Sequence, residues 1–88
     1  MKVYLVHNDF YDYCENAHGS LLLGIYATPE SAELARNDFI TQEVTNITKF
    51  GGRVQRSEDY DNNPIVTHCD GNEAIIDNVY VIEEWPVQ

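Results

Sequence analysis

The segment from Leu21 to Phe50 constrains the fold more than any other part of the sequence, because it joins an apolar strand to the only long amphipathic helix that the chain offers. The strand is predicted at Leu21–Ala27, an apolar run of strand length followed by a threonine and a proline. Strict alternation of apolar and polar residues is absent, so we expect a central strand with both faces covered. Gly24 within the run indicates a β-bulge, or a close approach by another backbone or ring.

The helix is predicted from Pro29 to about Lys49, and weak helix formers beyond Val44 are where it would fray or break. Thr28 is a suitable N-cap, and the proline at the first helical position lacks only an N–H that would have no partner. A glycine pair supplies the stop. Apart from Leu34, the apolar residues share one broad face at about 100° per residue. The residues of that face are Ala32, Ala35, Phe39, Ile40, Val44, Ile47 and Phe50.

Shorter apolar runs on both sides of this unit predict the remaining strands. One strand is predicted at Lys2–His7 and another at Arg53–Arg56. Two more are predicted at Ile65–Thr67 and Asn78–Trp85, with an Asp-Gly-Asn hairpin signal between them. The expected fold is a single α+β domain over residues 1–88: a small twisted, mainly antiparallel sheet of about three to five strands, with one long helix packed across one face.

The charge of the chain limits the partners that it can bind. The chain has fifteen acidic residues and five basic ones, which gives a formal net charge of −10. Direct binding of DNA or RNA is not expected, because phosphate contacts need a basic footprint, and anionic membranes are disfavoured for the same reason. Cations or a basic protein surface are the favoured partners. The alternative is that the acidity only keeps the protein soluble.

Targeting signals and membrane spans are not apparent in the sequence. The chain begins with a short strand pattern in place of a signal peptide, and no apolar run reaches membrane-span length. We therefore expect a cytoplasmic protein. In that compartment Cys14 and Cys69 would be reduced thiols and not a disulfide.

Two loops combine acidic and aromatic residues and are the predicted partner-binding segments. The first lies within residues 8–19 and the second within residues 57–64. Exposed aromatic rings make good contact residues because they supply a large area at little entropic cost. For the first loop, the alternative is that its rings fold back over the sheet. The predicted contact residues are Asp9, Phe10, Tyr11, Asp12, Tyr13, Glu15, Glu58, Asp59, Tyr60 and Asp61.

A metal site is the alternative suggested by the ligand-type residues. Cys14, His18, His68 and Cys69 could in principle complete a tetrahedral zinc site, although their spacing matches no familiar zinc finger. A Cys–His nucleophile pair with Cys14 or Cys69 is formally possible, but no orienting group or oxyanion loop is evident for it. The sequence also has no phosphate-binding glycine loop and no Ser-His-Asp pattern, so we expect neither a cofactor nor an enzymatic activity. The same residues leave open a small metal- or ligand-sensing module.

Three segments of the scaffold resemble a class of very short phage and prophage proteins. These segments are Lys2-Val3-Tyr4-Leu5-Val6, the stretch from Leu22 to Ala32, and Val79-Tyr80-Val81-Ile82-Glu83. The resemblance covers about a third of the chain and brings no catalytic residues with it. It implies a phage accessory protein, of the kind that inhibits host machinery as anti-CRISPR and anti-restriction proteins do. Several such inhibitors place carboxylates at the positions where their target binds nucleic-acid phosphates.

The sequence therefore supports two main hypotheses and a simpler third one. The first is an inhibitor that binds the basic surface of a host nucleic-acid enzyme as a nucleic-acid mimic. The second is the metal- or ligand-sensing module. The third is a self-associating structural domain, which is supported by strand residues that are apolar on both faces and would leave an uncovered sheet face available for a partner or a homodimer. Trp85 is expected to cover the core or to mark such an interface.

Overall fold

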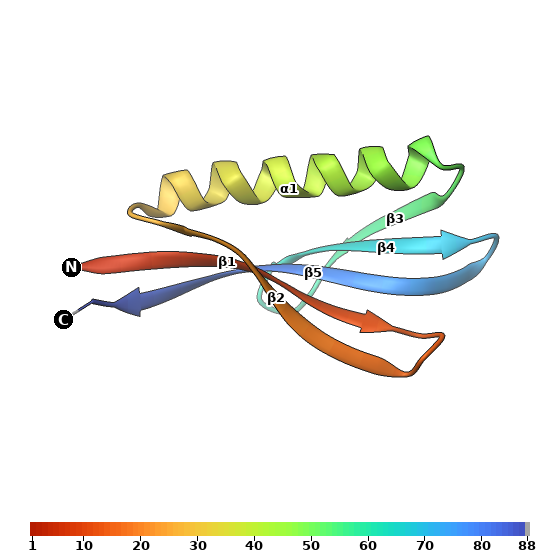
Figure 1. The fold of residues 1–88 in the computed structure, drawn as a ribbon, viewed down its shortest axis with the longest axis horizontal. Coiled ribbons are helices and arrows are strands. Elements are labelled where there is room, and N and C mark those ends of the chain that lie inside the picture. The colour runs from red at the N-terminus through yellow and green to blue at the C-terminus, as the bar shows by residue number, and fades with distance from the viewer. Residues whose placement is uncertain (88) are drawn as a thin grey trace.

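The computed structural model describes residues 1–87 as one five-stranded antiparallel sheet with a single helix lying along one face (Figure 1). The strand order is β2-β1-β5-β4-β3, with β1 and β5 in the interior. This arrangement confirms the predicted α+β class. The elements are β1 (Lys2–Asp12), β2 (Ala17–Tyr26), α1 (Pro29–Lys49), β3 (Arg53–Glu58), β4 (Pro64–Asp70) and β5 (Glu73–Pro86).

Helix α1 begins and ends at the predicted residues because both ends carry local signals. The Thr28 hydroxyl accepts a hydrogen bond of 3.1 Å from the Ser31 amide, which satisfies one of the free donors of the first turn. At the other end, Gly51 adopts a φ of +82°, the left-handed conformation that stops a helix. The weak helix formers after Val44 stay helical.

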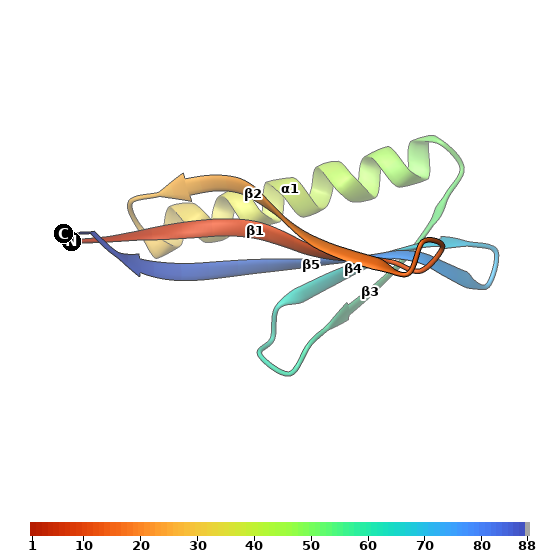
Figure 2. The same ribbon diagram turned by 60° about the horizontal axis from the view of Figure 1, so that its bottom comes forward.

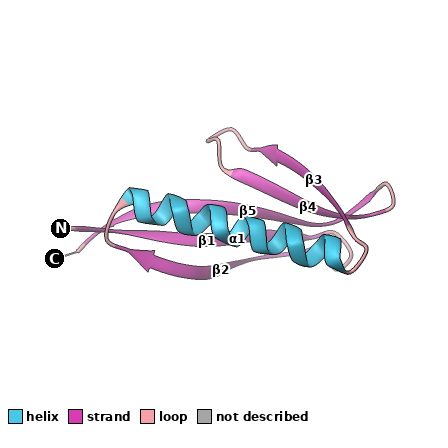
Figure 3. Cartoon of the chain, turned by 90° about the horizontal axis from the view of Figure 1, so that it is seen from above, coloured by secondary structure: helices cyan, strands magenta, loops and turns pink. Residues whose placement is uncertain are grey.

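The core lies between α1 and the sheet face that the helix covers. Ile40 and Ile47 of the helix meet Val66 and Tyr80 of the sheet, and all four side chains are buried. Burial disfavours the tyrosinate form and, together with the nearby carboxylate of Glu43, raises the pKa of Tyr80 to about 12. The opposite face of the sheet carries no helix in any of the views (Figures 2 and 3).

Most strands are longer than the sequence predicted. β1 continues five residues beyond His7 to Asp12, and β2 begins at Ala17, so a four-residue turn at 13–16 replaces the predicted long loop. The added stretch forms because Phe10 pairs with Gly19 and Tyr11 pairs with His18 across the hairpin. β4 and β5 also extend beyond their predicted ends. Polar residues of a type common in loops are held in these strands by pairing with the adjacent strands.

The prediction that the leucine-rich strand is central was wrong. β2 is an edge strand, and Leu21, Leu22 and Ile25 are each more than half exposed. The apolar side chains of this run do point to both faces of the sheet, but on an edge strand they stay partly exposed on both.

Both interpretations of Gly24 hold. Val6 pairs with Gly24 and His7 with Leu22, so Leu23 is the extra residue of a bulge. A Cβ at Gly24 would also lie 2.5 Å from the Tyr26 hydroxyl, which lies back over the glycine. A side chain at position 24 would therefore displace the Tyr26 ring from its place beside the bulge.

Phe50 also departs from its predicted place. It was assigned to the packed face of the helix, but its side chain is 84% exposed because it follows the last helical residue. Trp85 is half exposed on β5, so it does not close the core.

Candidate functional site

The aromatic residues predicted to form one contact surface lie on both faces of the β1–β2 hairpin. Phe10 lies on the face that α1 covers, where its ring approaches to 2.8 Å from the position of a Cβ at Gly19. Tyr11 and Tyr13 pack edge to face, with ring centroids 4.8 Å apart. The Tyr11 hydroxyl is also hydrogen-bonded to Asn16 in the turn. The rings thus fold back onto the hairpin, as the alternative interpretation held, while Tyr13 keeps about half of its surface exposed.

Asp12 and Tyr13 hold the β1–β2 turn in place. The Asp12 carboxylate accepts hydrogen bonds from the amides of Cys14 and Glu15, at 2.9 and 3.2 Å. The Tyr13 hydroxyl donates to Asp77 of β5, and this hydrogen bond is the main reason that the pKa of Tyr13 is raised. Glu15 is exposed and its side chain has no hydrogen bond within the described residues. Of these residues, Glu15 has the carboxylate most available to a partner.

Asp9 lies on the sheet face opposite α1, away from the turn. Its carboxylate is 3.0 Å from Nδ1 of His7, and Glu83 approaches the other ring nitrogen of that histidine at 3.4 Å. Asp9 is therefore part of a His-carboxylate group in the middle of the sheet.

The second predicted segment forms the β3–β4 turn. Asp59 accepts hydrogen bonds from the amides of Asp61 and Asn63, both at 2.9 Å, and from the Asn63 side chain at 3.1 Å. These bonds favour the carboxylate form and lower the pKa of Asp59. Tyr60 beside it is fully exposed. Asp59 therefore shapes the turn, whereas Tyr60 is free to make contacts.

The two predicted segments do not join into one surface. β1 and β4 both run antiparallel to β5, so the turn that ends β1 and the turn that begins β4 lie at opposite ends of their strands (Figure 3). Glu58, Asp59, Tyr60 and Asp61 are consequently directed away from the β1–β2 turn.

A different set of groups gathers at the end of the molecule away from both chain termini. We call this the distal end and define it as the β1–β2 turn at 13–16, the β4–β5 turn at 71–72, the adjoining strand ends and the C-terminal turn of α1 (Figure 1). Pairing of Asp12 with Ile76 brings the first two parts together. The carboxylates of the distal end are those of Asp12, Glu15, Asp70, Glu73 and Asp77.

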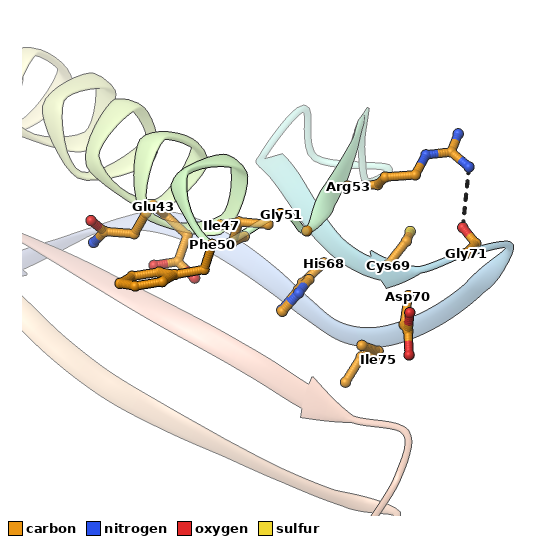
Figure 4. Close-up of a pocket in the computed structure, with 12 residues that line it drawn as sticks. Glu43, Ile47, Phe50, Gly51, Arg53, His68, Cys69, Asp70, Gly71 and Ile75 are labelled. Carbon is orange, nitrogen blue, oxygen red and sulfur yellow. Dashed lines mark hydrogen bonds between the residues drawn. The ribbon is translucent and has the colours of Figure 1, made fainter.

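A cleft of about 600 Å³ lies in the distal end, between the end of α1 and the sheet (Figure 4). Phe50 and Ile75 supply apolar lining, while Glu43, His68 and Asp70 supply polar groups. The volume is within the range of small-ligand sites, and it also suits a long side chain of a protein partner. This cleft is therefore a candidate site for a ligand-sensing function.

The C-terminal end of α1 forms one wall of the cleft. Carbonyl groups at a helix C-terminus carry a partial negative charge of about half an elementary charge. The Phe50 ring already lies 5.9 Å from the Lys49 ammonium, within the range of a cation–π contact. Arg53 is directed away from the cleft and donates to the Gly71 carbonyl at 3.2 Å (Figure 4). Arg53 and His68 are the basic residues that line the cleft, and Glu43 and Asp70 are the acidic ones.

The proposed zinc ligands are not assembled. His68 and Cys69 are consecutive on β4 and so point to opposite faces of the sheet, while Cys14 is exposed in the β1–β2 turn. His18 lies on β2 opposite Tyr11. Within residues 1–87, no three His, Cys, Asp or Glu side chains are grouped as metal ligands.

The acidic residues are almost entirely without basic partners. Among the described residues, the only pair between a carboxylate and a lysine or arginine joins Lys2 to Glu84, at 2.6 Å. That pair lies beside the chain termini, so it leaves the distal end without an ion pair. The pairing favours the charged ammonium and raises the pKa of Lys2.

Sequence reasoning missed half of the distal end. Asp70, Glu73 and Asp77 were not among the predicted contact residues, and Phe50 was assigned to the apolar face of the helix. An acidic Asp-Gly turn beside the last strand was visible, but its proximity to residues 12–15 depends on β1–β5 pairing over more than sixty positions.

Comparison with protein-family models, curated proteins and solved structures found no match for this chain. No helix in residues 1–87 is long and apolar enough to cross a membrane.

Proposed function

We propose that the protein is a binding protein that attaches through its distal end to a basic surface of another protein. The supporting observation is that only one of the fifteen acidic residues, Glu84, pairs with a lysine or arginine within the described chain. Uncompensated carboxylates stay hydrated in the free protein and gain strong charge-assisted hydrogen bonds when arginine or lysine side chains approach. The negative electrostatic potential of the protein also accelerates its association with a basic surface.

The target we favour is a host nucleic-acid enzyme, which the protein inhibits by occupying its phosphate-binding surface. Such a surface displays arginine and lysine side chains for the nucleic-acid backbone. The distal end offers carboxylates on neighbouring strands and a cleft with an aromatic wall, so a long cationic side chain can pack against Phe50 in a cleft that Glu43 and Asp70 also line. The resemblance to small phage proteins points to the same class of target.

Two charge-reversal variants with equal net charge test this proposal. One replaces exposed distal carboxylates: Glu15→Lys, Asp70→Lys and Glu73→Lys. The matched control changes exposed carboxylates elsewhere: Glu33→Lys, Asp38→Lys and Asp61→Lys. Each reversal adds two positive charges, so both variants go from −10 to −4. Asp12 is left unchanged because it holds the turn.

The measurement is affinity capture from bacterial lysate, elution with increasing salt, and an activity assay of any captured nucleic-acid enzyme. We expect the wild-type protein and the control variant to capture and inhibit the same enzyme, and the distal variant to lose it. Equal loss in both variants would show that net charge alone matters and would reject the distal end as the site. Capture that resists high salt, or capture without inhibition, would contradict the inhibitor proposal.

A further inference from the structure

The two edges of the sheet differ in a way that bears on self-association. β3, at one edge, carries Arg53, Arg56 and Glu58 among its six residues. Charges of this kind keep an exposed edge from pairing with another chain. β2, at the other edge, has ten residues without a single Asp, Glu, Lys or Arg. Each of the other four strands contains at least one of these charged residues.

The β2 edge is also apolar on both sides of the sheet. Leu21 is 56% exposed and pairs with Asn8, which places it on the face that α1 covers. Leu22 and Ile25 are 53% and 59% exposed and lie on the opposite face. A strand paired with residues 17–22 would cover Leu21 and Leu22 while it satisfied the free amides and carbonyls of that stretch, whereas Ile25 lies beyond the bulge.

The bulge at Leu23 sets the extent of this edge. Beyond it the strand is displaced by one residue, so regular pairing on the free side is confined to the six residues of 17–22. The same stretch pairs without interruption with β1 on its other side, from Asp12 to His7.

We propose that the free edge of β2 is a homodimer seam, where residues 17–22 of a second copy pair antiparallel across a two-fold axis and join two sheets into one. An isologous interface requires a surface that complements itself, and an uncharged strand with exposed leucines meets that requirement. A basic partner has no carboxylate to bind on β2. Two copies of this acidic chain, in contrast, meet no like charge on the seam itself.

No Asp or Glu lies on the seam, and the neighbouring carboxylates are those of β1 and of Glu15 in the β1–β2 turn. Asp9 stands opposite Ser20 and is held by His7, and Asp12 stands opposite Ala17 and is held by the turn amides. The two copies still repel each other through their total charge, and added salt screens that repulsion. The dimer should therefore tighten as salt rises, whereas binding of a basic partner should weaken. This opposite salt dependence separates the seam from the distal-end proposal, which it does not require.

Three leucine substitutions provide the test. Leu21→Lys and Leu22→Lys place an ammonium at the seam, on opposite faces of the sheet. Leu34→Lys is the control, because Leu34 is 69% exposed on α1 and the variant has the same net charge. Trp85→Lys examines the alternative of packing between the open sheet faces. Circular dichroism and urea unfolding show that each variant is folded.

Sedimentation equilibrium at low and high salt measures the dimer dissociation constant. We expect a wild-type dimer that tightens with salt, an increase of about tenfold or more in the constant for both seam variants, and no change for Leu34→Lys. Amide protection of residues 18–22 should rise with protein concentration. A wild-type monomer at all concentrations, or a dimer that Trp85→Lys dissociates and the seam variants do not, would overturn the proposal.

Discussion

The Tyr13 hydroxyl donates a hydrogen bond of 2.5 Å to the Asp77 carboxylate, across 64 positions of the chain. The second oxygen of Asp77 accepts a hydrogen bond of 2.6 Å from Thr67. One carboxylate therefore ties the β1–β2 turn to β5 and β4. The backbone of Tyr13 is also bound to β5, because its amide donates a hydrogen bond of 2.8 Å to the Ile75 carbonyl. These bonds fix the position of the hairpin that carries half of the distal end.

Replacing Tyr13 with phenylalanine tests this tie. We expect the free energy of unfolding to fall by about 1 kcal/mol or less at neutral pH, because half of the ring is exposed and water can take over the hydrogen bond. The fold raises the pKa of Tyr13 above its usual 10.0. The contribution is therefore complete below pH 10 and is lost as the pH rises through the higher folded pKa.

Urea unfolding at neutral and alkaline pH measures the effect. The wild-type protein should lose more stability on alkalinisation than Tyr13→Phe does. Tyr60→Phe is the control, since Tyr60 is fully exposed and its hydroxyl has no hydrogen bond within the described residues. An equal alkaline loss in wild type and Tyr13→Phe would contradict the role assigned to the hydroxyl.

Asp59 should make the β3–β4 turn sensitive to acid. Its carboxylate accepts three hydrogen bonds from residues 61 and 63, and its pKa is lowered from the ordinary 3.8. Its contribution to stability is therefore present above that value and is lost as the pH falls through the lower folded pKa. Asp59→Ala should speed hydrogen exchange at the Asn63 amide, while Asp61→Ala should leave it unchanged. NMR titration of Asp59 gives the pKa directly, and a normal value would count against this account.

Local signals explain why the helix could be predicted and the strand ends could not. Thr28, Pro29 and the glycine pair act within one turn of the helix ends, so the bounds of α1 follow from nearby residues. The end of β1 depends instead on partners that lie far away in sequence. Tyr11, for example, pairs with His18 on one side and with Asp77 on the other. A polar stretch that resembles a loop becomes strand when both sides are paired.

The order of strands in a sheet is likewise absent from local patterns. The run at Leu21–Tyr26 is apolar enough for a central strand, yet β2 has only one neighbour. The candidate site shows the same limitation. Asp12 and Glu15 were identified from the sequence, but Asp70, Glu73 and Asp77 join them only through the pairing of β1, β4 and β5. The acidity was predictable from the sequence, and its location was not.

Truncation of Ile40 should reveal how much the helix–sheet core stabilises the fold. Ile40 is 3% exposed and contacts the cluster that contains Val66 and Tyr80. Ile40→Ala should lower the free energy of unfolding by about 2–5 kcal/mol, through lost burial and the cavity left behind. Leu34→Ala, on the exposed side of the same helix, should change it by less than about 0.5 kcal/mol. Urea unfolding of both variants checks this, and similar losses would mean that α1 does not pack as described.

The adjacent glycines after α1 should respond to substitution for different reasons. A Cβ at Gly52 would lie 2.8 Å from a methyl group of Ile47 and 3.0 Å from the Ile47 carbonyl oxygen, and that oxygen belongs to the backbone and cannot turn aside. We expect Gly52→Ala to cost about 1–3 kcal/mol through this overpacking. Gly51 has open space around it but a φ of +82°, so Gly51→Ala should cost roughly 1 kcal/mol through backbone strain.

Asparagine separates the two mechanisms, because it tolerates the left-handed conformation better than alanine does. Gly51→Asn should therefore be more stable than Gly51→Ala, whereas Gly52→Asn should be no better than Gly52→Ala. Thermal and urea unfolding of the four variants provide the comparison. If asparagine rescued position 52 and not position 51, the assignment of conformational strain to Gly51 and steric contact to Gly52 would be reversed. The wall of the cleft would then be set by backbone conformation at Gly52 and not by its contact with Ile47.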